Sequence, residues 1–170
     1  GRFPFKEIVD SKFKLDDLTE DNLRFAQQMG VTHIVLHSPR LVKNGPLDYH
    51  MLLETREFIA SFGLQWTAIE NLATEHWGDV VEGAARRDDG IENVCRTLEN
   101  MGKVGIPILG YYFSLAEGGH WRSYDSSGGR GGAGIKSFDY EKVKNAPPSR
   151  HAPVSVEEMW ERLAYFLERV

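Results

Sequence analysis

Hydrophobic and polar residues alternate between a helical spacing and a strand-like spacing along the first two thirds of the chain. In the first round, Thr19 can cap a helix that continues to Met29 and stops at Gly30. The run from Val31 to Leu36 that follows is apolar and β-branched, interrupted only by Thr32 and His33, which is typical of a strand covered on both faces. A helix followed at once by such a strand is the repeating unit of an α/β fold.

The same order of elements returns twice. Asp48 can cap a helix closed by Gly63, and a strand from Leu64 to Ile69 follows and ends at Glu70. A third helix is predicted to begin at Asp89, and the strand 106–113 follows it. Because each helix joins its strand through one or two residues, the strands are expected to be parallel, with helical crossovers, and the fold class is α/β.

This pattern stops between residues 114 and 153, where glycines are frequent and a long active-site loop is predicted. A fourth helix begins near Ser155, with a capping box and a staple between Val154 and Met159. The apolar stripe expected to be buried on this helix consists of Met159, Trp160, Leu163, Phe166, Leu167 and Val170.

The stripe is still running at Val170, which predicts a truncated chain. Three parallel strands leave two sheet edges open, and a closed barrel would supply the missing strands. We therefore expect residues 1–170 to be one domain, the N-terminal half of a (β/α)8 barrel. Residues 1–14 can contain a first strand, but their pattern does not decide it.

The composition narrows the range of partners. A net charge of -5 gives no basic field for nucleic acid, and no apolar run is long enough to cross a membrane. Cys95 is the only cysteine and lies on the apolar stripe of a helix, where a small buried thiol is the usual explanation. We expect a cytoplasmic protein with neither nucleic-acid nor membrane partners.

Ligands of parallel α/β folds gather where strands end, so the residues after each strand are candidates for a site. His37 follows the first strand and Glu70 the second, and a carboxylate buried there needs a cation, a metal or a substrate hydroxyl. A structural ion pair is the alternative role for Glu70. Of Tyr111 and Tyr112, one should face the barrel lumen and the other the helices.

Within the glycine-rich segment, Trp121 and Arg122 combine a stacking surface with a forked cation, which suits the carboxylate of a sugar acid. The stretch 129–137 has some likeness to a phosphate-binding loop, but Ile135 breaks the spacing and no strand directly precedes it. A mobile lid or a flexible hairpin is the better interpretation.

Several segments in order resemble the mannonate dehydratase family: 68–72, 90–93, 105–113, 121–123, 128–133, 137–140 and 157–160. The resemblance implies a lyase of the xylose-isomerase-like barrel superfamily that removes water from D-mannonate to give 2-dehydro-3-deoxy-D-gluconate in glucuronate breakdown. It implies Mn2+ or Fe2+, whose His, Cys and Asp ligands are expected beyond residue 170, so this chain alone should be inactive. It leaves Cys95 outside the metal site.

The resemblance also implies that this part of the barrel supplies contacts to a small sugar acid. The nominated residues are Glu70, Tyr112, Trp121, Arg122, His37 and Arg130. Tyr112 stands where the family usually has a polar Asn or His, so substrate detail can differ. A homo-oligomer is expected.

Two other functions stay open at this point. A sugar isomerase or epimerase of the xylose-isomerase-like kind would share the fold and the strand-end carboxylates. A non-catalytic sugar-binding half-barrel, assembled by pairing of open sheet edges, also fits the composition.

Overall fold

The computed structural model describes residues 18–38, 45–115, 123–125, 128–145, 151 and 153–170. These residues fall into two compact units, and the smaller unit lies within residues 114–155. The larger unit comprises the described residues up to 113 together with 156–170.

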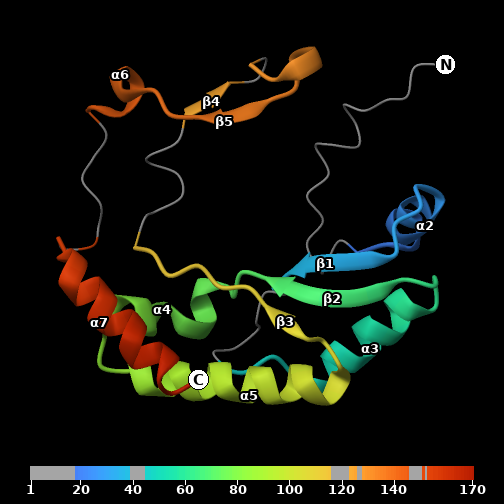
Figure 1. Ribbon diagram of the computed structural model, residues 1–170, viewed down its shortest axis with the longest axis horizontal. Coiled ribbons are helices and arrows are strands. Elements are labelled where there is room, and N and C mark those ends of the chain that lie inside the picture. The colour runs from blue at the N-terminus through green and yellow to red at the C-terminus, as the bar shows by residue number, and fades with distance from the viewer. Residues whose placement is uncertain (1–17, 39–44, 116–122, 126–127, 146–150, 152) are drawn as a thin grey trace. The chain divides into compact units, whose positions relative to one another are not determined.

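A parallel sheet of three strands, in the order β1-β2-β3, forms the centre of the larger unit (Figure 1). The strands are β1 (His33–His37), β2 (Gln65–Glu70) and β3 (Ile108–Leu109). Both ladders are parallel, as the repeated helix-to-strand pattern predicted. The carboxyl ends of the strands therefore meet at one edge of the sheet.

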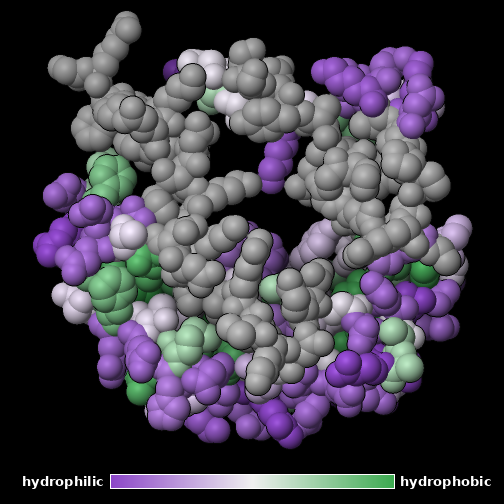
Figure 2. Space-filling model, turned by 180° about the vertical axis from the view of Figure 1, so that it is seen from behind, coloured by the Kyte–Doolittle hydropathy of each residue, from purple (hydrophilic) through white to green (hydrophobic). Residues whose placement is uncertain are grey.

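Helices α3 (Tyr49–Ala60), α4 (Thr74–Glu82) and α5 (Arg87–Val104) connect the strands and lie, with α7 (Val156–Leu167), on one side of the sheet (Figure 1). Helix α2 (Glu20–Gln28) precedes β1 and lies beside the amino end of that strand. Helix α4 was not expected from the sequence. Figure 2 shows a hydrophilic surface along the lower rim of the molecule, where the outer side of α5 carries charged side chains. Such amphipathic helices bury only the stripe that faces the sheet.

The core lies between the sheet and these helices. Leu36 and Ile69 from the strands pack in one cluster with Leu52, Ile59 and Met101 from the helices. Because side chains alternate along a strand, Val35 and Ile108 point away from the helices, and each is 56% exposed. One face of the sheet is thus covered by helices, and the other carries exposed apolar side chains.

Side chains of α5 fix the segment that leads into α3. The backbone N–H of Leu47 donates to Oγ1 of Thr97 at 3.0 Å, and Nδ2 of Asn100 donates to the Leu47 carbonyl at 2.8 Å. Leu47 and Thr97 are both fully buried. Both polar groups of the Leu47 backbone are therefore satisfied inside the core.

Two of the predicted caps are confirmed and one is wrong. Thr19 accepts from the N–H of Asn22, and Asp48 accepts from the N–H groups of His50 and Met51. Asp89 is not a cap, because α5 begins two residues before it, at Arg87. Asp88 and Asp89 instead lie in the first turn, where negative charge favours the helix dipole.

Two predicted extents differ from the structure. The third strand was expected over residues 106–113, but β3 covers only Ile108–Leu109. It starts after Pro107, which has no N–H to donate to a ladder. The stripe of α7 was expected to be buried throughout. Phe166 is buried against Trp77 of α4, whereas Trp160 and Leu167 are 65% and 51% exposed.

The smaller unit contains a short antiparallel hairpin of β4 (Ser123–Asp125) and β5 (Ile135–Ser137). A 3-10 turn, η2 (Arg130–Gly132), lies between the strands, and helix α6 (Tyr140–Val143) follows them. Asp139 caps α6 by accepting from the N–H of Glu141 at 3.1 Å. A hairpin was one of the two interpretations of this glycine-rich segment.

Candidate functional site

His37 and Glu70 meet at the carboxyl edge of the sheet. They are partners in the ladder between β1 and β2, and Nε2 of His37 lies 3.5 Å from Oε2 of Glu70. Their side chains are 48% and 53% exposed, so Glu70 does not bear the desolvation that full burial would impose. The edge presents an imidazole and a carboxylate side by side to solvent.

A β-bulge in β2 decides which face Glu70 occupies. Ile34 pairs with Trp66, but Val35 pairs with Ala68, so Thr67 is an extra residue in β2. In a regular ladder of the same sequence, the period-two alternation would place Glu70 on the same face as buried Trp66. Oγ1 of Thr67 donates to the Ile34 carbonyl at 3.3 Å and so spans the irregularity. Thr67 therefore helps to bring Glu70 to the face of His37.

Backbone hydrogen bonds hold the end of β2 from both sides. The Glu70 carbonyl accepts from the N–H of Ser38 at 3.2 Å, and the Ile69 carbonyl accepts from the N–H of Gly110 at 2.7 Å. Gly110 lies close enough that a Cβ there would be 3.5 Å from the backbone N of Asn71. Asn71 itself has a φ of 52°. The end of β2, which carries the Glu70 carboxylate, is thus hydrogen-bonded to the backbone on both sides, at Ser38 and at Gly110.

The other nominated residues are placed less completely. Tyr112 follows β3 and is 45% exposed, while the ring of Tyr111 packs edge-on against Trp77 of α4. Tyr111 is similarly exposed, at 43%, so exposure does not choose between the two tyrosines, and the role of Tyr112 stays a prediction. Arg130 is exposed in η2 of the smaller unit, and Trp121 and Arg122 lie outside the described residues. The structure therefore brings together His37 and Glu70 from the nominated set.

The described residues do not form a metal centre of three or more His, Cys, Asp or Glu side chains. His37 and Glu70 supply two donor atoms, whereas a protein site for a divalent transition ion uses at least three protein ligands. The described part of the chain therefore does not fit a complete site for Mn2+ or Fe2+.

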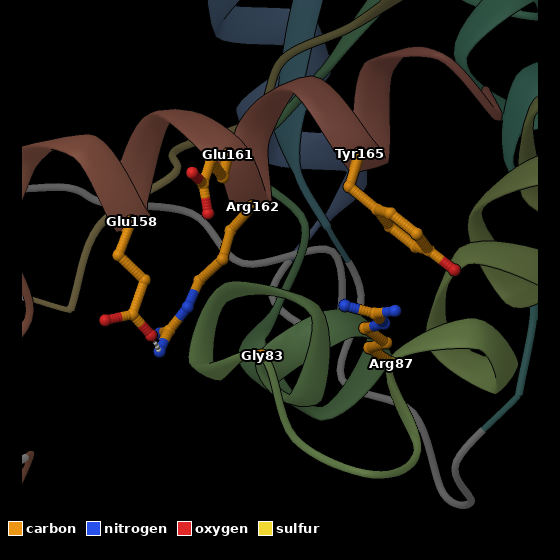
Figure 3. Close-up of a pocket in the computed structure, with 6 residues that line it drawn as sticks. All are labelled: Gly83, Arg87, Glu158, Glu161, Arg162 and Tyr165. Atoms are coloured by element: carbon orange, nitrogen blue, oxygen red, sulfur yellow. Dashed lines mark hydrogen bonds and ion pairs between the residues drawn. The ribbon is translucent and has the colours of Figure 1, made fainter.

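A cavity of about 300 Å3 lies in the helical layer, lined by Gly83, Arg87, Glu158, Glu161, Arg162 and Tyr165 (Figure 3). Both arginines that line it have partners: Arg162 bonds to Glu158 and to the Val81 carbonyl, and the Arg87 guanidinium lies 3.8 Å from the centre of the Tyr165 ring. These contacts join α7 to α4 and α5. We assign the cavity to helix packing.

The helices of the described residues include none that is both long enough and apolar enough to cross a membrane.

The family model described as D-mannonate dehydratase (UxuA) matches residues 16–152. The chain belongs to the D-mannonate dehydratase family. This match confirms the resemblance seen in the ordered segments.

Two curated relatives carry the name mannonate dehydratase. The protein of Streptococcus pneumoniae (strain 70585) is 25% identical over 142 residues, covering 70% of this chain and 38% of the relative. That of Streptococcus equi subsp. zooepidemicus (strain MGCS10565) is 34% identical over 62 residues, covering 36% of this chain and 16% of the relative. The chain thus spans well under half the length of these dehydratases.

A solved structure shows the fold. The crystal structure of mannonate dehydratase from Streptococcus suis serotype2 superposes with a TM-score of 0.72 at 22% identity, covering 95% of this chain and 46% of that one. The parallel sheet and its helices are therefore part of a (β/α)8 barrel, as the sequence predicted. In that fold the carboxyl edge holding His37 and Glu70 is the ligand-binding end.

Proposed function

We propose that this chain forms the substrate-binding part of a mannonate dehydratase, which eliminates water from D-mannonate to give 2-dehydro-3-deoxy-D-gluconate in glucuronate breakdown. The family match supports the reaction class. The observation that carries the site is the contact of His37 with Glu70 at the carboxyl edge of the partial barrel. Other parts of the barrel must supply the remaining strands.

The reaction sets the requirements of the site. The proton on the carbon next to the substrate carboxylate leaves, the hydroxyl on the following carbon departs as water, and the resulting enol becomes the 2-keto acid. A polyhydroxylated acid must be held so that only one hydroxyl can depart. Hydrogen bonds to the other hydroxyls fix that choice, because positioning contributes directly to rate.

Glu70 suits the binding of hydroxyls. Its carboxylate is an acceptor only, and an ionised acceptor forms hydrogen bonds about twice as strong as a neutral one. His37 lies beside it and limits the orientations that the carboxylate can take. In our proposal Glu70 accepts from a substrate hydroxyl and His37 positions Glu70, while Tyr112, Trp121, Arg122 and Arg130 stay candidates for further contacts.

The divalent ion that the family implies, Mn2+ or Fe2+, would act as a Lewis acid toward the developing enediolate. Because the described residues do not form its ligand set, we assign those ligands to the remaining strands and give this half no step through the metal. The roles proposed for Glu70 and His37 do not depend on which ion is used.

The test is turnover of D-mannonate by the intact protein supplied with Mn2+ or Fe2+, followed by mass spectrometry for loss of one water. Glu70→Gln should lower kcat/KM by about tenfold or more, since a hydrogen bond to a charged group is worth roughly 1.5–3 kcal/mol. Glu54→Gln is the control, because it makes the same charge change at an exposed residue of α3. If Glu70→Gln matches the wild type, Glu70 does not bind substrate.

Product analysis also separates the alternatives. Rearrangement of a sugar without loss of water would show an isomerase or epimerase. Calorimetric binding of a sugar acid without turnover would show a sugar-binding half-barrel. Either result would overturn the dehydratase proposal.

A further inference from the structure

Asn71, directly after Glu70, has an unusual backbone conformation. Its φ is 52°, and among the described residues the other positions with positive φ are all glycine: Gly30, Gly63, Gly83, Gly105, Gly131 and Gly132. Glycine takes this conformation freely, whereas a side chain makes it unfavourable, least so for Asn. Asn therefore stands at the strand end beside the carboxylate, at a position where the fold elsewhere uses glycine.

The segment around Asn71 is held on both sides. Before it, the backbone of residues 69–70 is bonded to Gly110 and Ser38. After it, Leu72 is 6% exposed, and its carbonyl accepts from the indole N–H of buried Trp77 at 3.3 Å. The backbone at Asn71 is thus fixed by its neighbours, although its own side chain is exposed.

The Asn71 amide forms no hydrogen bond with any described residue, so the fold does not use the polar group that replaces glycine. Strained residues kept by an over-determined surrounding are common at ligand sites. A carboxamide supplies both N–H donors and a carbonyl acceptor without charge. Such a group suits a sugar hydroxyl, which donates and accepts at once, and it complements the acceptor-only Glu70.

We propose that Asn71 is a substrate-binding residue, whose carboxamide hydrogen-bonds a hydroxyl group of the sugar acid held by Glu70. This inference rests on the proposed function for the identity of the ligand. It does not rest on turnover, because the hydrogen bond would form in the bound state whether or not elimination follows. Binding and rate therefore test it separately.

The decisive variant is Asn71→Gly in the intact protein, because glycine keeps the backbone conformation and removes only the carboxamide. We expect kcat/KM for D-mannonate and the calorimetric affinity for D-mannonate to fall about three- to tenfold, as for loss of one neutral hydrogen bond. The Tm should stay close to that of the wild type. Asn71→Ala should show the same loss of binding and also lower the Tm by roughly 2–4 °C, since alanine does not tolerate the left-handed conformation.

Gln65→Ala is the matched control, because Gln65 is an exposed carboxamide at the opposite end of β2. It should leave affinity within about twofold, since ligands bind at the carboxyl ends of barrel strands. Unchanged affinity and kcat/KM in Asn71→Gly would show that Asn71 is only a turn residue, with the dehydratase function intact. A third outcome is a wild type that binds D-mannonate without turning it over, together with weaker binding by Asn71→Gly. This result would support the role of Asn71 and refute the dehydratase proposal. A wild type that binds no sugar acid would overturn both.

Discussion

His37 Nε2 lies 3.5 Å from Glu70 Oε2 because the two residues are direct partners across the ladder between β1 and β2. Their side chains are about half exposed, at 48% and 53%. Contacts between exposed ionisable side chains contribute little to stability, about 0–1 kcal/mol. In our proposal this contact belongs to a ligand site, so its removal should change activity much more than stability.

We therefore expect His37→Gln, Glu70→Gln and the double variant to change the free energy of unfolding by less than about 1 kcal/mol each. Their effects on kcat/KM should be large and not additive, because the imidazole acts through the carboxylate. Urea denaturation and steady-state kinetics measure the two quantities. Additive losses of activity would show that His37 acts independently of Glu70.

Thr67 offers a test of the bulge. In Thr67→Val the Ile34 carbonyl loses its side-chain donor, which should lower stability by about 1 kcal/mol and reduce kcat/KM by misplacing Glu70. Thr67→Ser retains the hydroxyl and should recover most of the activity. Urea denaturation and kcat/KM measure the two effects, and a Val variant as active as the wild type would show that the hydroxyl does not position the carboxylate.

Gly83 and Arg162 are sterically coupled. Gly83 ends α4 with a φ of 65°, and a Cβ there would lie 2.8 Å from Nε of Arg162. Gly83→Ala should therefore be more destabilising than Gly30→Ala, where the φ of 77° is similar but no atom lies within 4 Å of the Cβ. Gly30→Ala measures only the cost of placing a side chain in the left-handed conformation, which is about 1–2 kcal/mol.

A double-mutant cycle with Arg162→Ala isolates the clash at Gly83. The loss caused by Gly83→Ala should shrink to the Gly30→Ala value once the guanidinium is gone. Thermal or urea unfolding of the four proteins gives the coupling energy. Equal losses at the two glycines in the wild-type background would remove the steric argument.

Burial, and then the nearby charges of Glu92 and Glu99, raise the pKa of the Cys95 thiol above its ordinary value. Thiolate is the reactive form, so alkylation by iodoacetamide near pH 8 should be slower in the native protein than after denaturation. A raised pKa means that the folded state holds the proton more tightly. The contribution of this group to stability is therefore present below the ordinary thiol pKa and is lost as the pH rises through the folded pKa.

Much of the larger unit followed from local signals in the sequence. Thr19 and Asp48 mark helix starts by their capping oxygens, and Gly30 and Gly63 mark stops by their positive φ. The prediction of Asp89 as a cap was wrong, because the sequence pattern of a capping box does not distinguish a cap residue from an acidic residue in the first turn. Helix α4 was missed because its N-cap position is Ala73, which makes no side-chain cap hydrogen bond. The exposure of Trp160 depends on the tertiary contacts of α7, and the spacing of apolar residues along the helix does not determine those contacts.

The candidate site was predictable in part. His37 and Glu70 were nominated because they end apolar strands, but their direct pairing depends on register. The sequence pattern did not mark the bulge at Thr67. Asn71 lies directly after the same strand, β2, and within the segment 68–72, but the sequence pattern does not mark its left-handed conformation, with a φ of 52°.

The order of strands in the sheet is also their order in the sequence. During synthesis each new strand can therefore pair with one that has already left the ribosome, without waiting for a later segment. Glu70 can come into register with His37 before β3 has been made. The hydrogen bond from the N–H of Gly110 to the Ile69 carbonyl can form only after β3 has been made, when β1 and β2 are already available to pair.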